Sequence, residues 1–339
     1  MKQMTKLERL QAAIRREPVD RVPYAVWRHF PDVDRSAAGL AQTTLRFHER
    51  YGSDFIKLTP NGGYAVQEWG CVESDQLRPD GHRPCASCAV QSGEDWRKIT
   101  PLDPGGTPGY VDQIESIIRM GFDRRVDAPV MPTLFSPLSL ARKLSGERLN
   151  TDLRERPALV RAALDAITET LVRFADLAIT EGVTGIFYSI QAASRRFHSE
   201  EEYAQFGEPY DRSFLDELRD RALLVIHCHG EDLMFDRLAQ LPGDFWNWET
   251  RSTPPSLSDG KAMVGGAVMG GLDQWRTLRD GTPEAVVEQV QDAVAQTGGT
   301  GLVVAPGCVL TMGTPDANVA AVVRTLGGSL KPVPGVKLS

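Results

Sequence analysis

Residues 156–190 read RPALVRAALDAITETLVRFADLAITEGVTGIFYSI, a long helical pattern followed by a short apolar run. Within 156–181 the apolar side chains recur at spacings of three and four, the period of one helix face. Residues 185–190 (GIFYSI) are rich in β-branched and aromatic residues and too short for a helix, so they predict a buried strand. A helix that leads into a buried strand is the repeating unit of α/β proteins.

The same alternation continues in both directions along the chain. Short apolar runs predict strands at residues 21–28, 54–60, 129–135, 185–190, 222–229, 244–250, 262–269 and 301–308. A further helix is predicted over 283–296, because Thr282 and Pro283 open it and Gly298 follows it. Eight strands alternating with helices predict an α/β protein, a single (β/α)8 TIM barrel. An open doubly wound sheet is the alternative, although no G-x-G-x-x-G follows the first strand.

Two segments lie outside this alternation. The first 21 residues, MKQMTKLERLQAAIRREPVDR, predict a charged amphipathic N-terminal helix. Residues 61–96 form too long a stretch for a simple connection and contain Gly, Pro and alternating polar residues. We expect a β-hairpin insertion after the second strand, lying as a flap over the barrel mouth. No linker is visible, so residues 1–339 are expected to form one domain.

The composition limits the class of protein. Of the 339 residues 41% are hydrophobic and 24% charged, which excludes disorder and a coiled coil. The 38 Lys and Arg against 45 Asp and Glu give a net charge of −7, the wrong sign for a nucleic-acid or anionic-membrane surface. No apolar run approaches the roughly 20 residues that cross a bilayer. The five cysteines, without a secretion signal, indicate a cytoplasmic protein with reduced thiols.

Three residues at predicted strand ends have the chemistry of a metal site. His227 and His229 are two apart on one strand, so they share a face, and Cys228 points the opposite way. Cys308, at the end of the last strand, completes a His/His/Cys set that suits zinc with one position open. Glu249 is either a fourth ligand or a general base. The alternative is that both histidines are core residues and Cys308 a buried small side chain.

A rival cluster lies in the insertion, and other strand ends carry polar groups. Cys71, His82, Cys85 and Cys88 can form a structural zinc site or be ordinary loop residues. His29 and Gln191 are candidates to position a substrate, although His29 is as easily a structural loop residue. The predicted substrate-binding residues, some of which must be core, are Trp27, Arg28, Tyr64, Tyr188, Ser189 and Trp248.

Several segments together resemble the uroporphyrinogen decarboxylase superfamily, which includes zinc- and corrinoid-dependent methyltransferases. They are EPVDRVP (17–23), FSPLSLARKLSG (135–146), GIFYSIQ (185–191), IHCHG (226–230) and APGCVLTMGTPDANVAAVV (305–323). The last is the most specific, since it matches the PGC…P-x-x-N ending through Pro306, Gly307, Cys308, Pro315 and Asn318. The resemblance runs from Lys6 to Leu326 and itself implies a TIM barrel.

The resemblance separates two branches of that superfamily. True decarboxylases open with an arginine-rich MRQAGR-type segment and place a catalytic Asp after the second strand. Here Arg28 is the single arginine, and the second strand ends Lys57-Leu58-Thr59-Pro60, without an acid. Too few cations are present for a porphyrin with eight carboxylates, so uroporphyrinogen itself is not the expected substrate.

The methyltransferase branch carries zinc on an H-x-C-G motif and a later PGC cysteine. The resemblance therefore implies zinc on His227, His229 and Cys308, with His229 replacing the first cysteine. This replacement makes the site one charge unit more positive, which favours activation of an oxygen over methylation of a thiol. The expected function is a zinc-dependent methyltransferase or demethylase that moves a methyl group from a small O-methyl or related substrate to a corrinoid protein or other acceptor. The corrinoid is expected on a separate protein, because a D-x-H-x-x-G signature is missing, and a homodimer is expected by analogy. A small-molecule decarboxylase or lyase and a non-catalytic metal-binding barrel are the alternatives.

Overall fold

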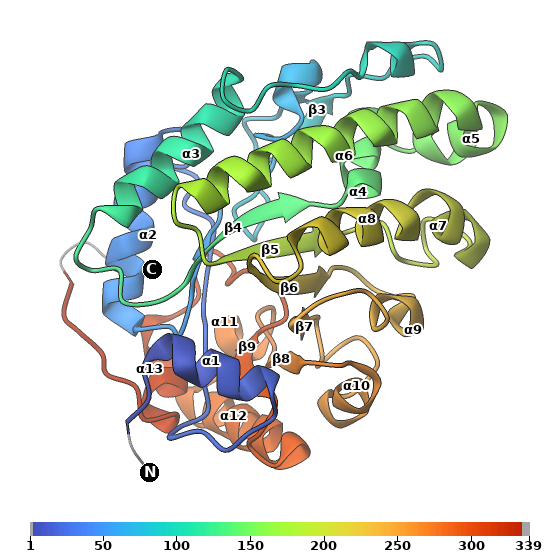
Figure 1. Cartoon of the computed structure of the whole chain (residues 1–339). Helices are drawn as coiled ribbons and strands as arrows, with labels where there is room; N and C mark the ends of the chain where they lie inside the picture. Colours follow the sequence, from blue (N-terminus) through green and yellow to red (C-terminus); the bar gives the residue numbers. More distant parts are fainter. Residues whose placement is uncertain (1–2, 334–339) are drawn as a thin grey trace.

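Seven parallel strands form one curled sheet at the centre of the computed structural model, which describes residues 3–333 (Figure 1). Their order is β1-β4-β5-β6-β7-β8-β9, so each strand pairs with its neighbours along the chain. Their bounds are β1 (Ile56–Leu58), β4 (Val130–Phe135), β5 (Gly185–Ile190), β6 (Leu223–Cys228), β7 (Phe245–Asn247), β8 (Ala267–Leu272) and β9 (Leu302–Pro306). The α/β class and the TIM-like arrangement of parallel strands are confirmed.

The first predicted strand, residues 21–28, is reduced to a single bridge between Tyr24 and Val304. Beside this bridge Ala25 N–H donates to the Val304 carbonyl at 3.0 Å, and Val304 N–H donates to the Pro23 carbonyl at 2.9 Å. The segment therefore lies alongside β9, at the position where an eighth strand of a barrel belongs.

Side chains explain why this segment forms no ladder with β1. Asp54 N–H donates to the Tyr24 carbonyl at 2.8 Å. In the other direction, Tyr24 N–H donates to the Asp54 carboxylate at 2.8 Å and Val26 N–H donates to Ser53 Oγ at 3.1 Å. Side-chain acceptors thus replace the backbone carbonyls of a regular ladder.

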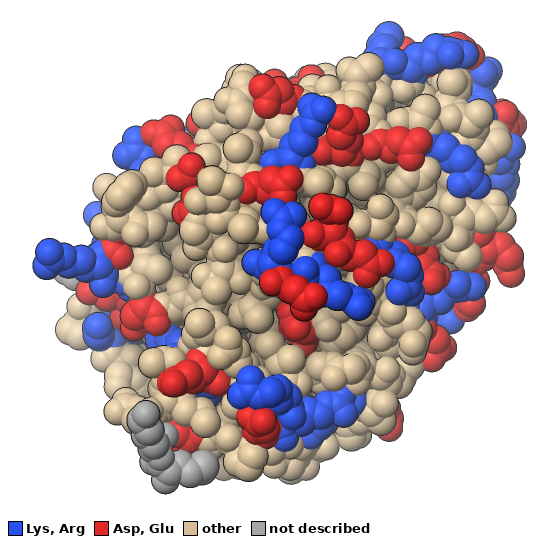
Figure 2. Space-filling view, in the orientation of Figure 1, with Lys and Arg blue, Asp and Glu red and all other residues tan. Residues whose placement is uncertain are grey.

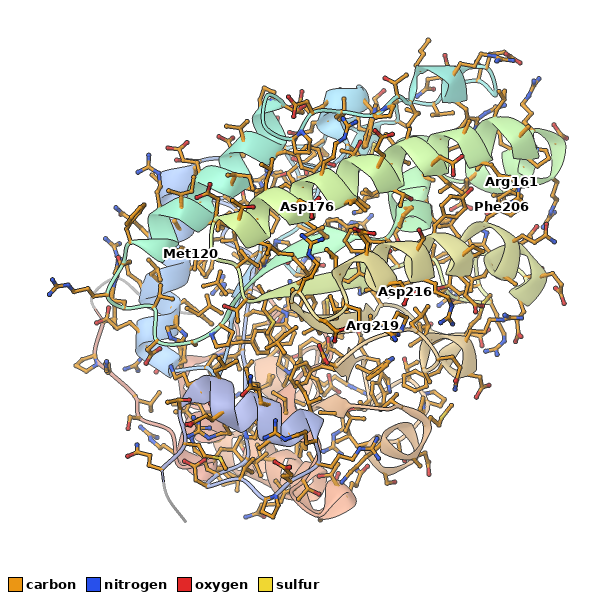
Figure 3. The ribbon with its side chains drawn as sticks, viewed as in Figure 1. Met120, Arg161, Asp176, Phe206, Asp216 and Arg219 are labelled. Atoms are coloured by element: carbon orange, nitrogen blue, oxygen red, sulfur yellow. The ribbon has the colours of Figure 1, made fainter. Side chains whose placement is uncertain are left out.

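Helices surround the sheet, as Figure 1 shows for α6 and α8 in front of β4 and β5. Two predictions are close: the helix expected at 156–181 is α6, and that expected at 283–296 is α12. In Figure 3 the labelled Arg161 of α6 lies by Phe206 of α7, with its guanidinium 4.3 Å from the ring centre. The helices are α1 (Lys6–Ile14), α2 (Ala37–Tyr51), α3 (Pro108–Gly121), α4 (Pro137–Ser145), α5 (Arg148–Glu155), α6 (Pro157–Thr180), α7 (Glu200–Phe206), α8 (Glu208–Leu218), α9 (Phe235–Leu238), α10 (Leu257–Met263), α11 (Thr277–Asp280), α12 (Pro283–Thr297) and α13 (Asp316–Thr325).

One predicted strand is shifted. The run at 262–269 was expected to be extended throughout, but α10 continues to Met263 and β8 begins at Ala267. Gly266 passes so close to Asp244 that a Cβ there would lie 2.1 Å from the Asp244 carbonyl oxygen. The apolar residues at 262–264 therefore belong to the end of a helix and its turn, and the strand starts after the glycines.

The core has two parts, one on each face of the curled sheet. The larger part lies between the strands and the helices. The smaller part fills the inside of the curl with one side chain in two along each strand, including Phe55, Phe187 and Phe245. Leu10 and Ala13 of α1 join this inner cluster, so the predicted N-terminal helix covers the end of the sheet where the strands begin.

Residues 61–96 contain a short antiparallel pair, β2 (Val72–Glu73) with β3 (Cys85–Ser87), and two 3-10 turns, η1 (Gln67–Trp69) and η2 (Asp95–Lys98). The chain between β2 and β3 reaches the opposite end of the sheet from α1, the end where the strands finish. There Met312 N–H donates to the Pro79 carbonyl at 2.8 Å.

Charged side chains of both signs are mixed on the face that Figure 2 shows, without a large patch of one sign. Ion pairs such as Arg221 with Asp176, 2.7 Å apart, account for part of this mixing. Within residues 3–333, no helix is long and apolar enough to span a membrane.

Candidate metal centre

His227, His229 and Cys308 meet at the carboxyl end of the sheet. One ligand atom from each lies within 4.8 Å of the other two. Cys308 Sγ is 3.7 Å from His229 Nδ1, and the two imidazole centres are 5.6 Å apart. The sequence placed these residues at the ends of two strands that are distant in the chain, and the curled sheet brings them together.

The strands explain how the three side chains are held. His227 lies on β6 in register with Ser189 of β5 and Asn247 of β7. His229 follows β6 and stays tied to the sheet, because its N–H donates to the Ile190 carbonyl at 3.0 Å. Cys228 is buried on the opposite face, as the alternation along a strand requires.

Gly307 lets the end of β9 approach the centre. A Cβ at this position would lie 2.5 Å from the Glu249 Cα, so only glycine fits without moving the backbone. Its N–H donates to Gln274 Oε1 at 3.1 Å, which fixes the turn that presents Cys308.

The side chain of Asn247 sets the orientation of His227. Asn247 Nδ2 donates to two backbone carbonyls, those of Met269 and Pro306, each at 3.1 Å. Its Oδ1 is therefore the acceptor that faces His227 Nδ1, 2.6 Å away. The proton must then be on Nδ1, which leaves the Nε2 lone pair of His227 free to bind a metal ion.

Burial lowers the pKa of both histidines, so both are in the neutral form that binds metals. The pKa of Lys57, the inward-facing residue of β1, is also lowered by burial, to about 8. Its Nζ lies 4.5 Å above the Phe187 ring and donates to Thr59 Oγ1 at 3.4 Å. Within the described chain Lys57 forms no ion pair with a carboxylate. Lys57 is not among the predicted site residues, although a lysine inside the apolar run 54–60 is a visible signal.

Glu249 lies beside the three-residue cluster without joining it. Its carboxylate accepts from Ser252 Oγ at 3.2 Å and from Trp275 Nε1 at 3.4 Å. Its charge acts on His229, where it opposes part of the lowering of the pKa by burial. A fourth-ligand role for Glu249 is therefore not visible in this geometry, whereas a role as a nearby base is compatible with it.

The segment Pro79–His82 covers the end of the first predicted strand. The His29 Cβ would lie 3.0 Å from a Cβ added to Gly81. The pKa of His29 is lowered to about 3, first by burial and then by the charge of Lys57. Its Nδ1 is buried without a hydrogen-bond partner in the described residues. His82 Nδ1 lies 3.0 Å from Asp80 Oδ1.

Three aromatic residues predicted to contact substrate lie in the core outside the curl. Tyr64 donates to the Thr133 carbonyl at 2.7 Å and packs on other aromatic rings. Tyr188 donates to Asp211 Oδ1 at 2.7 Å. Trp248 donates to the Pro255 carbonyl at 3.0 Å. Tyr188 lies on β5, whereas Tyr64 and Trp248 lie in the segments after β1 and β7. A contact of these three residues with a substrate stays a prediction.

Arg28 is also turned away from the inside of the curl. Its neighbour Trp27 packs on Phe55 and Phe187 inside, so alternation sends Arg28 outward. Its Nη2 contacts Met312 Sδ at 3.0 Å, and its Nε donates to the His29 carbonyl at 3.2 Å. Arg28 therefore does not face the histidine–cysteine cluster.

The remaining candidates lie at the correct end of the sheet. Ser189 is buried one strand from His227, in register with it. Gln191 follows β5, is half-buried and is held by a hydrogen bond from its N–H to Ser139 Oγ at 2.7 Å. Their roles toward a substrate stay predictions.

A cavity of about 890 Å³ lies at the other end of the sheet, lined by residues that precede the strands, such as Thr184 and Asp244. Active sites of barrels of this kind lie at the carboxyl ends of the strands. We therefore place the functional site at the histidine–cysteine cluster and not in this cavity.

These features define an α/β protein of TIM-like architecture with a candidate metal centre at its strand ends. A profile of the uroporphyrinogen decarboxylase (URO-D) family matches residues 5–328, and the chain belongs to this family of enzymes. The predicted superfamily is confirmed.

Curated relatives match over most of the chain. Methylcobamide:CoM methyltransferase MtbA of Methanosarcina acetivorans is 23% identical and covers 96% of this chain and 98% of its own. Methylated-thiol–coenzyme M methyltransferase of Methanosarcina mazei is 27% identical over 75% of this chain and 67% of its own. A solved methyltransferase structure from Methanosarcina mazei superposes with a TM-score of 0.80 at 20% identity, covering 95% and 98% of the two chains, which supports the fold.

Proposed function

We propose that this protein is a zinc-dependent methyltransferase that moves a methyl group between a small molecule and a corrinoid carried by a separate protein. The observation that carries the proposal is the convergence of His227, His229 and Cys308 within 4.8 Å. Relatives named as methylcobamide and methylated-thiol methyltransferases support the reaction class.

The donor set fits zinc. Two imidazoles and one thiol are borderline-soft ligands, and three protein ligands leave a position for a substrate. Asn247 already orients His227 for metal binding. Residues that hydrogen-bond to a zinc ligand usually orient it in this way. When bound, zinc supplies a Lewis acid that polarises the substrate atom carrying the methyl group.

The other residues have distinct expected tasks. Glu249 accepts or returns a proton beside His229, since its carboxylate is half-buried and unpaired with a cation in the described chain. Gln191 and His29 position the substrate from two different strand ends. Trp27 and Ser189 form the inner wall, and Lys57 adds a positive charge that favours a substrate with negative charge.

The substrate is proposed to be an O-methyl or related small compound, because a His/His/Cys set is more positive than one with two thiolates. A methylated thiol is the second candidate, favoured by the printed names of the relatives. A small-molecule decarboxylase or lyase is a third, favoured by the name of the family.

The first experiment measures zinc in protein purified without tag histidines, for wild type and for His227→Ala, Cys308→Ala and Cys228→Ala. We expect about one zinc per chain, as a single tetrahedral site binds. The metal should be lost in the first two variants and kept in Cys228→Ala, whose side chain points away from the cluster. A wild type that binds no zinc after incubation with the metal would contradict the proposal.

The second experiment tests the reaction with free cobalamins in place of the corrinoid protein. Cob(I)alamin with O-methyl compounds should give methylcobalamin, and methylcobalamin with thiols should give thioethers; absorbance spectra follow both. Release of carbon dioxide from small carboxylic acids without methyl transfer would favour the lyase. Zinc binding without any turnover would favour a binding protein. Light scattering tests the expected homodimer.

A further inference from the structure

A pair of thiols in the 61–96 segment is independent of the metal centre. Cys85 begins β3 and is exposed, and Cys88 is half-buried just after the same strand. Their Sγ atoms are 3.7 Å apart. Cys71 is buried nearby, and its thiol points to the Lys143 carbonyl at 3.6 Å.

We propose that Cys85 and Cys88 are a thiol–disulfide exchange site, which a low-molecular-weight disulfide such as oxidised glutathione converts to an intramolecular disulfide. Bonded sulfurs lie about 2.0 Å apart, so the two atoms need only a small approach. The C-x-x-C spacing keeps both thiols in one short segment, so no other part of the fold has to move.

The different exposure of the two thiols sets the order of the steps. Cys85 is the accessible sulfur, and its thiolate attacks the small disulfide to give a mixed disulfide and one released thiolate. Cys88 then loses its proton to solvent and attacks Cys85 Sγ, which releases the second small thiol. The sum is two protein thiols and one small disulfide giving one protein disulfide and two small thiols.

The neighbouring groups favour this pair over other partners of Cys85. Burial raises the pKa of Cys88 to about 11 and that of Cys71 to about 12. Cys71 is buried whereas Cys88 is half-buried, so Cys71 is the less accessible thiol. Both thiols interact with that of Cys85, and Cys88 does so from the same short segment, with its Sγ 3.7 Å from Cys85 Sγ.

A zinc site on these cysteines is not supported by the geometry. Among the described residues, His227, His229 and Cys308 are the only group of three or more ligands that converge closely enough. His82, the fourth candidate from the sequence, contacts Asp80 beside the strand ends. The pair lies instead at the base of the Pro79–His82 segment, since Cys85 is in register with Glu73 across β2 and β3.

The test uses the full chain, reduced, freed of reductant and incubated with oxidised glutathione before free thiols are alkylated. The endoproteinase Asp-N cleaves before Asp75 and Asp80 and so separates Cys71 from Cys85 and Cys88. Mass spectrometry of the peptide that begins at Asp80 should show a loss of two hydrogens and no alkylation.

Three variants identify the mechanism. Cys88→Ser should stop at a glutathione adduct on Cys85, and Cys85→Ser should leave Cys88 mostly unmodified. Cys71→Ser, the matched control, should form the Cys85–Cys88 disulfide as the wild type does. The proposal is overturned if both thiols of the wild type remain alkylatable, if Cys71 is crosslinked to Cys85, or if added zinc binds to the pair and blocks oxidation.

Discussion

At the scale of single residues, the proposed metal centre depends on an amide that is not one of its three candidate ligands. Asn247 donates to two backbone carbonyls and accepts from His227, so it fixes which imidazole nitrogen carries the proton. Supporting residues of this kind usually contribute a factor of 10–100 to metal affinity.

We predict that Asn247→Ala lowers zinc affinity by roughly 10- to 100-fold, measured by competition with a chromophoric chelator. Asn318→Ala is the matched control. Asn318 is also buried and donates to two backbone carbonyls, those of Leu278 and Gly281. Both variants should be less stable than the wild type, but only Asn247→Ala should have a lower zinc affinity. Equal affinities in the two variants would show that Asn247 has a purely structural role.

Much of this residue-scale arrangement followed from alternation along strands. The two-residue spacing of His227 and His229 was enough to predict a shared face. The same rule places Tyr188 and Arg28 outside the curl, because each follows an inward-facing aromatic residue, Phe187 or Trp27. The sequence could not reveal the contacts of Glu249 with Ser252 and Trp275, because these depend on how the loops after the strands fold.

At the scale of elements, a buried carboxyl group joins a strand to two helices. Asp211 of α8 accepts from Tyr203 of α7 at 2.6 Å and from Tyr188 of β5 at 2.7 Å. Burial raises the pKa of Asp211 to about 7. The folded protein therefore binds a proton that the unfolded chain has released between about pH 4 and pH 7.

The sign follows from this difference in bound protons. Stability contributed by Asp211 is present below pH 4 and is lost as the pH rises to 7, by at most about 4 kcal/mol. Asp211→Asn does not titrate. The difference in unfolding free energy between variant and wild type should shift in favour of the variant over this range, as measured by urea unfolding at several pH values. A constant difference from pH 4 to pH 7 would contradict the prediction.

Helices were predictable from their period and caps, as α6 and α12 show. The strand expected at 21–28 is not formed as a ladder, and this could not be predicted from the sequence. Its N–H groups donate to the side chains of Asp54 and Ser53 in place of backbone carbonyls. Such substitution of side chains for backbone depends on residues distant in the chain, and no local pattern indicates it.

At the scale of the whole molecule, Asp54 connects the N-terminal helix α1 to the segment around Tyr24 that lies alongside β9. It is fully buried, and its carboxylate lies 2.6 Å from Arg9 Nη1 and 2.8 Å from Arg21 Nη1. It also accepts from Tyr24 N–H. Loss of this carboxylate would remove one of the two acidic partners of the nearly buried Arg9, which keeps Asp20, and would leave Tyr24 N–H without its acceptor.

We predict that Asp54→Ala costs roughly 3–5 kcal/mol of unfolding free energy, the usual cost of breaking a buried ion pair. Urea unfolding followed by circular dichroism measures it. Glu115→Ala is the control, because Glu115 pairs with Arg119 on the exposed face of α3, where such pairs contribute little. An unfolding midpoint of Asp54→Ala equal to that of the control would refute the prediction.

The bridge between Tyr24 and Val304 also constrains how the chain folds. Its two halves are almost at opposite ends of the sequence, so the curl cannot close until nearly all of the strands exist. During synthesis the segment around Tyr24 must wait, exposed, for β9 to leave the ribosome. Contacts of such long sequence separation slow folding and leave unpaired edges open to aggregation. Final closure therefore follows the synthesis of β9, and the earlier strands depend on their own helices, or on chaperones, until it occurs.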